Sequence, residues 1–392
     1  MSYVTRRAYV LVFSLAALTT PRLAAQQAKH VAWEWGFHGV VLMNAFYNDN
    51  KVNNSDLPLG VSTPDTTATF LPNTSLGATI RQTRLIGTAD LAGFAGGDLH
   101  TELDVDFFGG QLNNGRTGPV PHVRRAIGEI TWDRASLLIG QEGPLVADVN
   151  PTSLATLGIP GYTSAGNLWF WIPQIRVGYD LTHGNGVRIG AQVALLDGMT
   201  EEPQGTSFTT PTRAERSGRP MVEGRLRARW GDGGDLGIGG HLSWLATTGD
   251  SLLLAKAFVI SGVVPLTSTF ELRGEWYTGQ GLSGLGGGAI GQPSNSLGEP
   301  LKDDGGWGQL NAKAGANWEV GVGFGYSNPQ GTAADQANKA FKDLNTQYGG
   351  RLQWRHTPAV VAFEYRHLAT TYGGPIGERS ATHLNLAMGV EF

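Results

Sequence analysis

Cysteine is absent from the 392-residue chain, so no disulfide can stabilise its fold. Long apolar runs are also missing: beyond the N-terminal segment, none reaches the about 20 residues that a membrane-spanning helix needs. The formal net charge is −4, without the basic excess that favours nucleic-acid binding. These absences exclude a disulfide scaffold, a helical membrane protein and an electrostatic binder of nucleic acid.

The first residues have the layout of a secretory signal peptide. Arg6 and Arg7 provide a basic start, and residues 8–18 form an apolar run that is too short for a spanning helix. We therefore expect residues 1–25 to be a signal peptide. Residues 26–392 would then form a single exported domain, which is β-rich because glycine (57) and tryptophan (11) are abundant and apolar runs are short.

The C-terminal residues alternate in the manner of a β-strand. Leu384, Leu386, Met388 and Val390 would lie on one face, with small or polar residues between them on the other. This pattern is typical of a strand between lipid and a wet interior. The chain also ends on Phe392, and here it resembles bacterial outer-membrane barrels, whose final strand typically ends in phenylalanine.

The same pattern along the chain predicts sixteen strands. They are residues 33–46, 79–91, 98–108, 123–132, 135–141, 173–181, 187–197, 221–230, 236–245, 252–264, 270–278, 307–314, 318–327, 346–356, 359–368 and 380–392. Every second connection is a turn of a few residues, and nearly all the others are longer. Because such alternation is typical of transmembrane barrels, we predict an all-β fold: a transmembrane antiparallel β-barrel of 16 strands with an inward-folded third external loop.

Charged side chains are expected on the inward face of these strands, because a charge at the lipid midplane would cost about 2–4 kcal/mol. A solid core could not hydrate so many ions, so the lumen should hold water. The predicted pore-lining basic residues are Arg84, Arg125, Arg176, Arg188, Arg225, Arg227, Arg229, Arg351 and Arg355. The predicted pore-lining acidic residues are Glu102, Asp104, Asp106 and Glu129.

Two groups of these charges are expected to behave differently. Arg84 and Arg125 flank the strand that carries the acidic residues, so we expect them to neutralise it. The arginines of residues 225–229 lie between strands with few acids, so we expect them to face the solute. Opposed basic and acidic rows would set a field across the pore and orient dipolar or anionic solutes.

Residues 143–172 have neither strand alternation nor a sustained helical period, although two good strand candidates flank them. A structureless stretch of this length is unusual in a soluble domain, but a barrel lumen can receive it. We expect this third external loop to narrow the channel. The candidate constriction residues are Glu142, Asp148, Asn150, Thr152, Ser153 and Tyr162.

Here the chain resembles the trimeric general porins, in which the third loop folds inward. The sequence LIGQ at residues 138–141, the long loop rich in proline and glycine, and PQIR at residues 173–176 resemble the DcaP-type porin family more narrowly. This resemblance implies a homotrimer in the bacterial outer membrane that passes small, often negatively charged organic solutes. A nearly neutral loop opposite an arginine wall also favours a modest preference for anions. We expect no cofactor and no nucleic-acid partner.

Other functions compete with that of a porin. His241 and Ser243 share one strand face, as in outer-membrane phospholipases, but the flanking leucines would turn the pair toward the lumen rather than lipid. We therefore expect no enzyme. One strand face carries His100, Glu102, Asp104 and Asp106, which could hold a cation, but residues along one strand converge poorly, so we expect no metal site. A nonconducting adhesin or scaffold barrel stays open, and conductance after reconstitution separates it from a porin.

Overall fold

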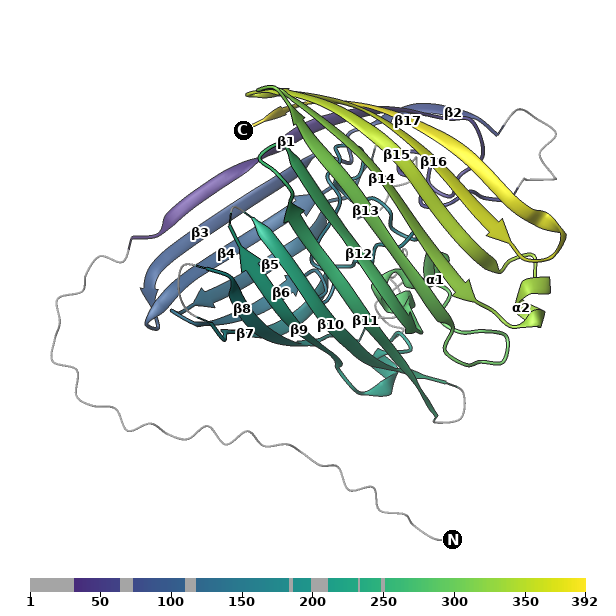
Figure 1. Ribbon diagram of the computed structural model, residues 1–392, viewed down its shortest axis with the longest axis horizontal. Helices are drawn as coiled ribbons and strands as arrows, with labels where there is room; N and C mark the ends of the chain where they lie inside the picture. Colours follow the sequence, from purple (N-terminus) through teal and green to yellow (C-terminus); the bar gives the residue numbers. More distant parts are fainter. Residues whose placement is uncertain are drawn as a thin grey trace, which may run out of the picture. The chain divides into compact units, whose positions relative to one another are not determined.

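Seventeen β-strands form one antiparallel sheet in the described part of the computed structural model (Figure 1). The structure describes residues 32–63, 73–109, 118–182, 186–198, 211–231, 233–247 and 251–392, with the backbone alone at position 290. The chain from Trp33 to Phe392 forms one compact unit. The signal peptide predicted at residues 1–25 lies outside the described residues and stays a prediction.

The strands are β1 (Glu34–Asn48), β2 (Ser75–Thr79), β3 (Arg84–Phe94), β4 (Gly97–Asp106), β5 (His122–Thr131), β6 (Ala135–Glu142), β7 (Ile172–Asp180), β8 (Arg188–Leu196), β9 (Met221–Trp230), β10 (Gly234–Ala246), β11 (Leu252–Pro265), β12 (Phe270–Gln280), β13 (Lys302–Ala314), β14 (Trp318–Gln330), β15 (Lys342–His356), β16 (Ala359–Tyr372) and β17 (Gly377–Glu391). The short helices are η2 (Glu215–Ser217), η3 (Leu282–Leu285), α1 (Gly287–Gly291), α2 (Ala333–Ala337) and η4 (Gly374–Ile376). No helix in the described ranges combines the length and the apolar composition needed to cross a membrane.

Strand β1 closes the sheet into a barrel. It pairs with β17 on one side, where Val40 lies opposite Glu391, and with β2 and then β3 on the other. In Figure 1 the first strand (purple) accordingly lies beside the last (yellow). Because β2 and β3 follow each other along the same partner, they occupy one position, and the seventeen strands make a 16-position barrel. The predicted all-β antiparallel barrel of 16 strand positions is confirmed.

The break between β2 and β3 has a local cause. Thr83 exchanges hydrogen bonds with the backbone of Leu42, since its Oγ1 accepts from Leu42 N at 3.0 Å and donates to Leu42 O at 3.2 Å. A side chain thus replaces the usual ladder partner. Gln82 is buried, and its side chain donates to Ala155 O at 2.8 Å, in the connection between β6 and β7. The single strand predicted at residues 79–91 is therefore interrupted.

Side chains alternate between an exposed apolar face and a buried polar face. On β17, Leu386, Met388 and Val390 are exposed, whereas His383 and Asn385 are buried. The outward face carries large apolar residues on nearly every strand, and such a continuous patch requires apolar surroundings. Polar side chains face inward, so the barrel has no uniform hydrophobic core.

Candidate functional site

The connection between β6 and β7, residues 143–171, crosses the interior of the barrel; we call it the inner loop. Val146 N donates to Glu223 Oε2 of β9 at 3.2 Å, Leu168 N to Glu275 Oε1 of β12 at 3.0 Å, and Leu154 N to Glu364 Oε1 of β16 at 2.7 Å. These strands lie at separate positions around the closed sheet. A single loop can reach all of them only from within.

Buried carboxylates hold the inner loop. Glu364 Oε1 accepts from Leu154 N and from Ala155 N at 3.0 Å, and the carboxylate also accepts from Ser153 Oγ at 2.7 Å. The carboxylates of Glu223 and Glu275 are also buried. Backbone N–H groups supply the partners that a buried charge requires. These glutamates therefore accept hydrogen bonds from loop N–H groups that secondary structure does not pair.

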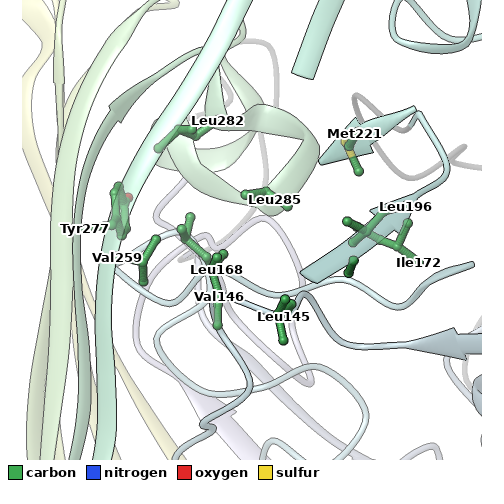
Figure 2. Close-up of a cluster of buried hydrophobic side chains, with 12 residues drawn as sticks. Leu145, Val146, Leu168, Ile172, Leu196, Met221, Val259, Tyr277, Leu282 and Leu285 are labelled. Atoms are coloured by element: carbon green, nitrogen blue, oxygen red, sulfur yellow. The ribbon is translucent and has the colours of Figure 1, made fainter. Parts of the chain in front are cut away.

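An apolar cluster fills the space between the inner loop and one part of the barrel. Leu145, Val146 and Leu168 of the loop pack with side chains from β8, β9, β11, β12 and η3 (Figure 2). Trp169 N also donates to Leu285 O of η3 at 2.8 Å. Close apolar packing excludes water, so no aqueous space is left between the inner loop and these strands.

Tight backbone packing fixes the opposite part of the loop. Gly166 has a φ of 101°, and a Cβ there would lie 2.2 Å from the backbone oxygen of Gly306. Tyr162 also has positive φ and stacks on Trp307, with ring centroids 5.7 Å apart. Non-glycine residues adopt this conformation only where their surroundings enforce it. The inner loop therefore has a defined conformation within the barrel.

A cavity of about 430 Å³ remains between the inner loop and strands β3–β7. Arg84, Arg124, Arg125 and Arg176 line it from the strands; we call these four residues the arginine wall. The loop contributes polar and aromatic residues on the facing side, including Asp148, Asn150, Ser153, Trp169 and Trp171.

The acids of β4 lie behind the arginine wall rather than opposite it. Arg84 Nε donates to Asp104 Oδ1 at 2.8 Å, and Arg125 Nη1 to Glu102 Oε1 at 2.6 Å. Arg125 also binds Glu142 at 2.7 Å. The side chain of Asp104 is 0% exposed, against 26% for Arg84. The guanidinium groups, rather than the carboxylates of β4, therefore face the cavity.

Arg124 belongs to the wall although strict alternation with Arg125 would turn it outward. The register of β4 and β5 shifts between Asp104 and Val105, so that Arg124 is left without a paired residue. A β-bulge of this kind places two successive side chains on one face. Arg124 is buried, stacks 4.7 Å from the ring of Trp171 and lies 3.7 Å from an oxygen of Asp106.

The three arginines of β9 that were predicted to face the solute are all paired with acids, although Arg227 and Arg229 also line two hollows near the short turns. Arg225 is buried, its side chain forms an ion pair with Asp148 of the inner loop, and it lies 3.6 Å from Asp235. Arg227 Nε donates to Asp235 Oδ2 at 2.7 Å, and Arg229 binds Asp180 at 2.6 Å. Each of these three arginines therefore pairs with an acid of the inner loop, of β7 or of β10.

The remaining predicted basic residues, Arg188, Arg351 and Arg355, lie in three different surroundings. Arg351 is buried, forms an ion pair with Glu319 and lines a small cavity of about 30 Å³. Arg355 is half exposed and pairs with Glu391 at 3.0 Å. Arg188 is exposed and lines two hollows near the short turns, of about 380 and 640 Å³; Glu129 lines the first of them.

The predicted loop residues divide between two sides. Glu142, Asp148, Asn150 and Ser153 line the cavity facing the arginine wall. Thr152 faces the other way, where its N–H donates to Gln309 Oε1 at 2.7 Å, and Tyr162 is buried against β13. Of the predicted acids, Asp104 and Asp106 are fully buried and therefore do not line open space.

His241 and Ser243 form part of a buried row. Nε2 of His241 lies 2.9 Å from Ser243 Oγ, and its Nδ1 lies 2.9 Å from Glu223 Oε1. The order acid–imidazole–hydroxyl is that of a hydrolase triad. However, all three side chains are at most 4% exposed, and the same glutamate holds the backbone of Val146. The row lies beneath the inner loop.

The acidic strand shows no convergent metal site. His100 Nδ1 lies 2.7 Å from Asp90, and Glu102 and Asp104 bind separate arginines. Among the residues that the structure describes, no group of three or more metal-ligating side chains could hold an ion.

Solved bacterial barrels share this fold. The chain is similar to the outer membrane channel DcaP of Acinetobacter baumannii, with 15% identity and a TM-score of 0.69 over 92% of this chain and 97% of that one. An anion-selective porin from Comamonas acidovorans has 12% identity and a TM-score of 0.59, over 92% of this chain and 100% of that one. OmpT, an outer membrane protein of Vibrio cholerae in trimer form, has 12% sequence identity and a TM-score of 0.54, over 92% of this chain and 100% of that one.

No protein-family model and no curated protein matches the sequence. At these identities the structural likeness establishes the fold, which is the porin-type β-barrel.

Proposed function

We propose that this chain is an outer-membrane porin, which forms a water-filled channel for the passive diffusion of small hydrophilic solutes. The observation that carries this proposal is the cavity between the inner loop and the arginine wall. A closed barrel of this size is wide enough for an aqueous channel. The exposed apolar outer face matches a membrane environment, since a patch of this extent is unfavourable in water.

The solute pathway follows strands β3–β9. The cavity beside Arg176 lies at the level of the inner loop, and two hollows lined by Arg188 and Arg229 lie nearer the short turns. The apolar cluster closes the space on the opposite side of the loop. Solutes would therefore pass along one part of the barrel wall rather than through its centre.

The channel would have a modest preference for anionic organic solutes. The arginine wall supports it, because guanidinium edges of Arg84, Arg125 and Arg176 face the cavity while the carboxylate of Asp104 lies behind them. Glu142 and Asp148 also line the cavity and limit this preference, although Arg125 and Arg225 pair with them. The likeness to the Comamonas acidovorans porin, a protein described as anion-selective, is consistent with this assignment.

A homotrimer in the bacterial outer membrane is the proposed assembly. The OmpT structure supports it by analogy, because that protein is described in trimer form. No enzymatic role is assigned to His241 and Ser243. Their burial beneath the inner loop keeps a diffusing solute from the hydroxyl, so the row would support the loop through Glu223.

Reconstitution into a planar bilayer tests this proposal. Stepwise conductance is expected, and a salt gradient should give a reversal potential of the sign that anion preference produces. Absence of conductance would favour the scaffold alternative. A clear cation preference would refute the assigned role of the arginine wall while leaving the channel itself intact.

A further inference from the structure

Two lysines lie on the outward, otherwise apolar face of the barrel. Lys256 follows the same side of β11 as the exposed Leu254 and Phe258, while Ala255 and Val259 point inward and are buried. Lys302, at the start of β13, is exposed as well. Neither lysine forms an ion pair within the described parts of the chain.

The register brings these lysines into one row across three strands. Lys256 lies opposite Gln280 of β12, and Gln280 lies opposite Lys302. Gln280 uses its side-chain nitrogen to bind Leu254 O at 2.8 Å, which leaves the two ammonium groups on either side of a neutral residue. Positive charge is therefore concentrated on a short stretch of the outer face.

The row lies at the depth of a membrane interface. Lys256 precedes the turn that begins at Leu266 by about ten residues, the length a tilted strand needs to cross the hydrocarbon layer. The outward side chains between them include Phe258 and Ile260, which are apolar. Lysine at the end of an apolar stretch can extend its ammonium group toward lipid headgroups.

An apolar groove of about 610 Å³ runs beside the lysines. Two outward glycines, Gly224 and Gly240, lie opposite each other and leave its floor without side chains. Val222, Leu242 and Phe258 form its sides. A Cβ on Gly240 would meet its nearest neighbour at 3.5 Å, an ordinary contact distance, so close packing does not require glycine there.

We propose that this groove and the Lys256–Lys302 row bind a phosphate-bearing lipid, with an acyl chain in the groove and the phosphate between the lysines. The inference rests on the proposed membrane location. Charge complementarity determines the occupant, because the row carries a net positive charge that an uncharged lipid would not compensate. Asp304, two residues from Lys302 on the same strand, offsets one of the two positive charges, and its Oδ1 accepts from Asn328 at 3.2 Å and from Gln330 at 3.1 Å.

Native mass spectrometry of the full-length purified protein tests the site. The protein is mixed in neutral detergent with phosphatidic acid, with a diacylglycerol of the same chains, or with inorganic phosphate. We expect phosphatidic acid to be retained and diacylglycerol to be lost. K256Q/K302Q should reduce retention of phosphatidic acid about fivefold for each lysine. Equal retention by wild type and K256Q/K302Q would overturn the proposal.

Further variants separate the two halves of the site. G224V/G240V fills the groove without touching either lysine and should also reduce lipid retention. D304N should retain at least as much lipid as the wild type, and K339Q, which removes an exposed lysine of another loop, should not change retention. Competition by inorganic phosphate alone at the same concentration would identify a free-phosphate site and refute the lipid assignment.

The channel measurement is independent of this outcome. K256Q/K302Q should conduct as the wild type does, because both lysines lie outside the lumen. A wild type that retains lipid without conducting would refute the porin proposal alone. A conducting protein whose lysine variants keep their lipid would refute the lipid site alone.

Discussion

Arg176 is the member of the arginine wall with the fewest charged partners. Its Nη2 donates to Gly143 O at 3.0 Å and to Gln174 Oε1 at 3.0 Å, and no carboxylate in the described ranges forms an ion pair with it. Arg84 and Arg125, in contrast, each bind an acid. The charge of Arg176 is therefore the least compensated in the arginine wall, and it would be the most available to an anion in the proposed channel.

We predict that Arg176→Gln lowers the anion-to-cation permeability ratio about two- to fivefold. One unit charge a few ångströms away in water contributes up to about 1 kcal/mol, and glutamine keeps a donor for Gly143. Reversal potentials under a salt gradient measure the change. Arg355→Gln serves as the control, because that arginine is half exposed and paired with Glu391. An equal shift in both variants would contradict a local effect.

The contacts of Glu364 with the inner loop can be tested by a single substitution. Glu364→Ala leaves the N–H groups of Leu154 and Ala155 without their acceptor, and hydrogen bonds to a charged group contribute about 1.5–3 kcal/mol. We expect increased noise of the open channel and a lower free energy of unfolding. Single-channel recording and urea titration measure these quantities. Glu378→Ala, at an exposed position, should change neither.

The side-chain orientation on regular strands could be predicted from the sequence, but the ion-pair partners of the arginines could not. Alternation placed Arg84, Arg125 and Arg176 inward, and all three line the cavity. Arg124 was missed because a bulge has no period-2 signature. Arg225 was expected to face the solute because nearby strands carry few acids, yet it pairs with Asp148, which comes from a distant loop. Contacts of that kind require knowledge of the loop's course.

The inner loop determines the aperture of the proposed channel at the scale of an element. We predict that deleting part of residues 150–166 raises single-channel conductance, since these residues lie between the arginine wall and β13–β16. The barrel should still form, because its strand pairing does not involve them. Planar-bilayer recording gives the conductance. Removal of a similar number of residues around α2, in the loop between β14 and β15, is the matched control and should have little effect.

The loop's existence could be predicted, whereas its course could not. Its length and lack of periodicity between strands 135–141 and 173–181 indicated an irregular segment. Its path depends on separate acceptors such as Glu223, Glu275 and Glu364, which no local pattern links to it. The β2–β3 break likewise depends on a side-chain contact of Thr83 with a distant strand.

At the scale of the whole molecule, the exposed outer face should tolerate apolar residues and reject charge. Val322 lies on β14, opposite Leu310 and Gly350, and is 54% exposed. We predict that Val322→Arg lowers the free energy of unfolding in lipid vesicles by about 2–4 kcal/mol, the cost of an arginine near the bilayer midplane. Val322→Leu should be close to neutral. A neutral Val322→Arg would argue against lipid contact at this position.

The barrel itself was predictable because three separate patterns agreed. Strand alternation, the rhythm of short and long connections and the inward placement of charge each depend on the same architecture. Strand ends were less clear: β13 begins at Lys302, ahead of the predicted 307, because Gly305 and Gly306 have no side chains to display an alternation. Glycine-rich segments hide the signal on which such predictions depend.

The attachment of the inner loop to Glu364 also has a consequence for biogenesis. Ser153 and its acceptor are separated by 211 positions, and Glu364 belongs to the penultimate strand. Contacts of such high sequence separation form late, because the intervening chain must first be ordered. The loop emerges early in synthesis but must wait for strands made near the end. Narrowing of the aperture would therefore coincide with completion of the barrel, so that an incompletely assembled intermediate would be the leakiest form of the protein.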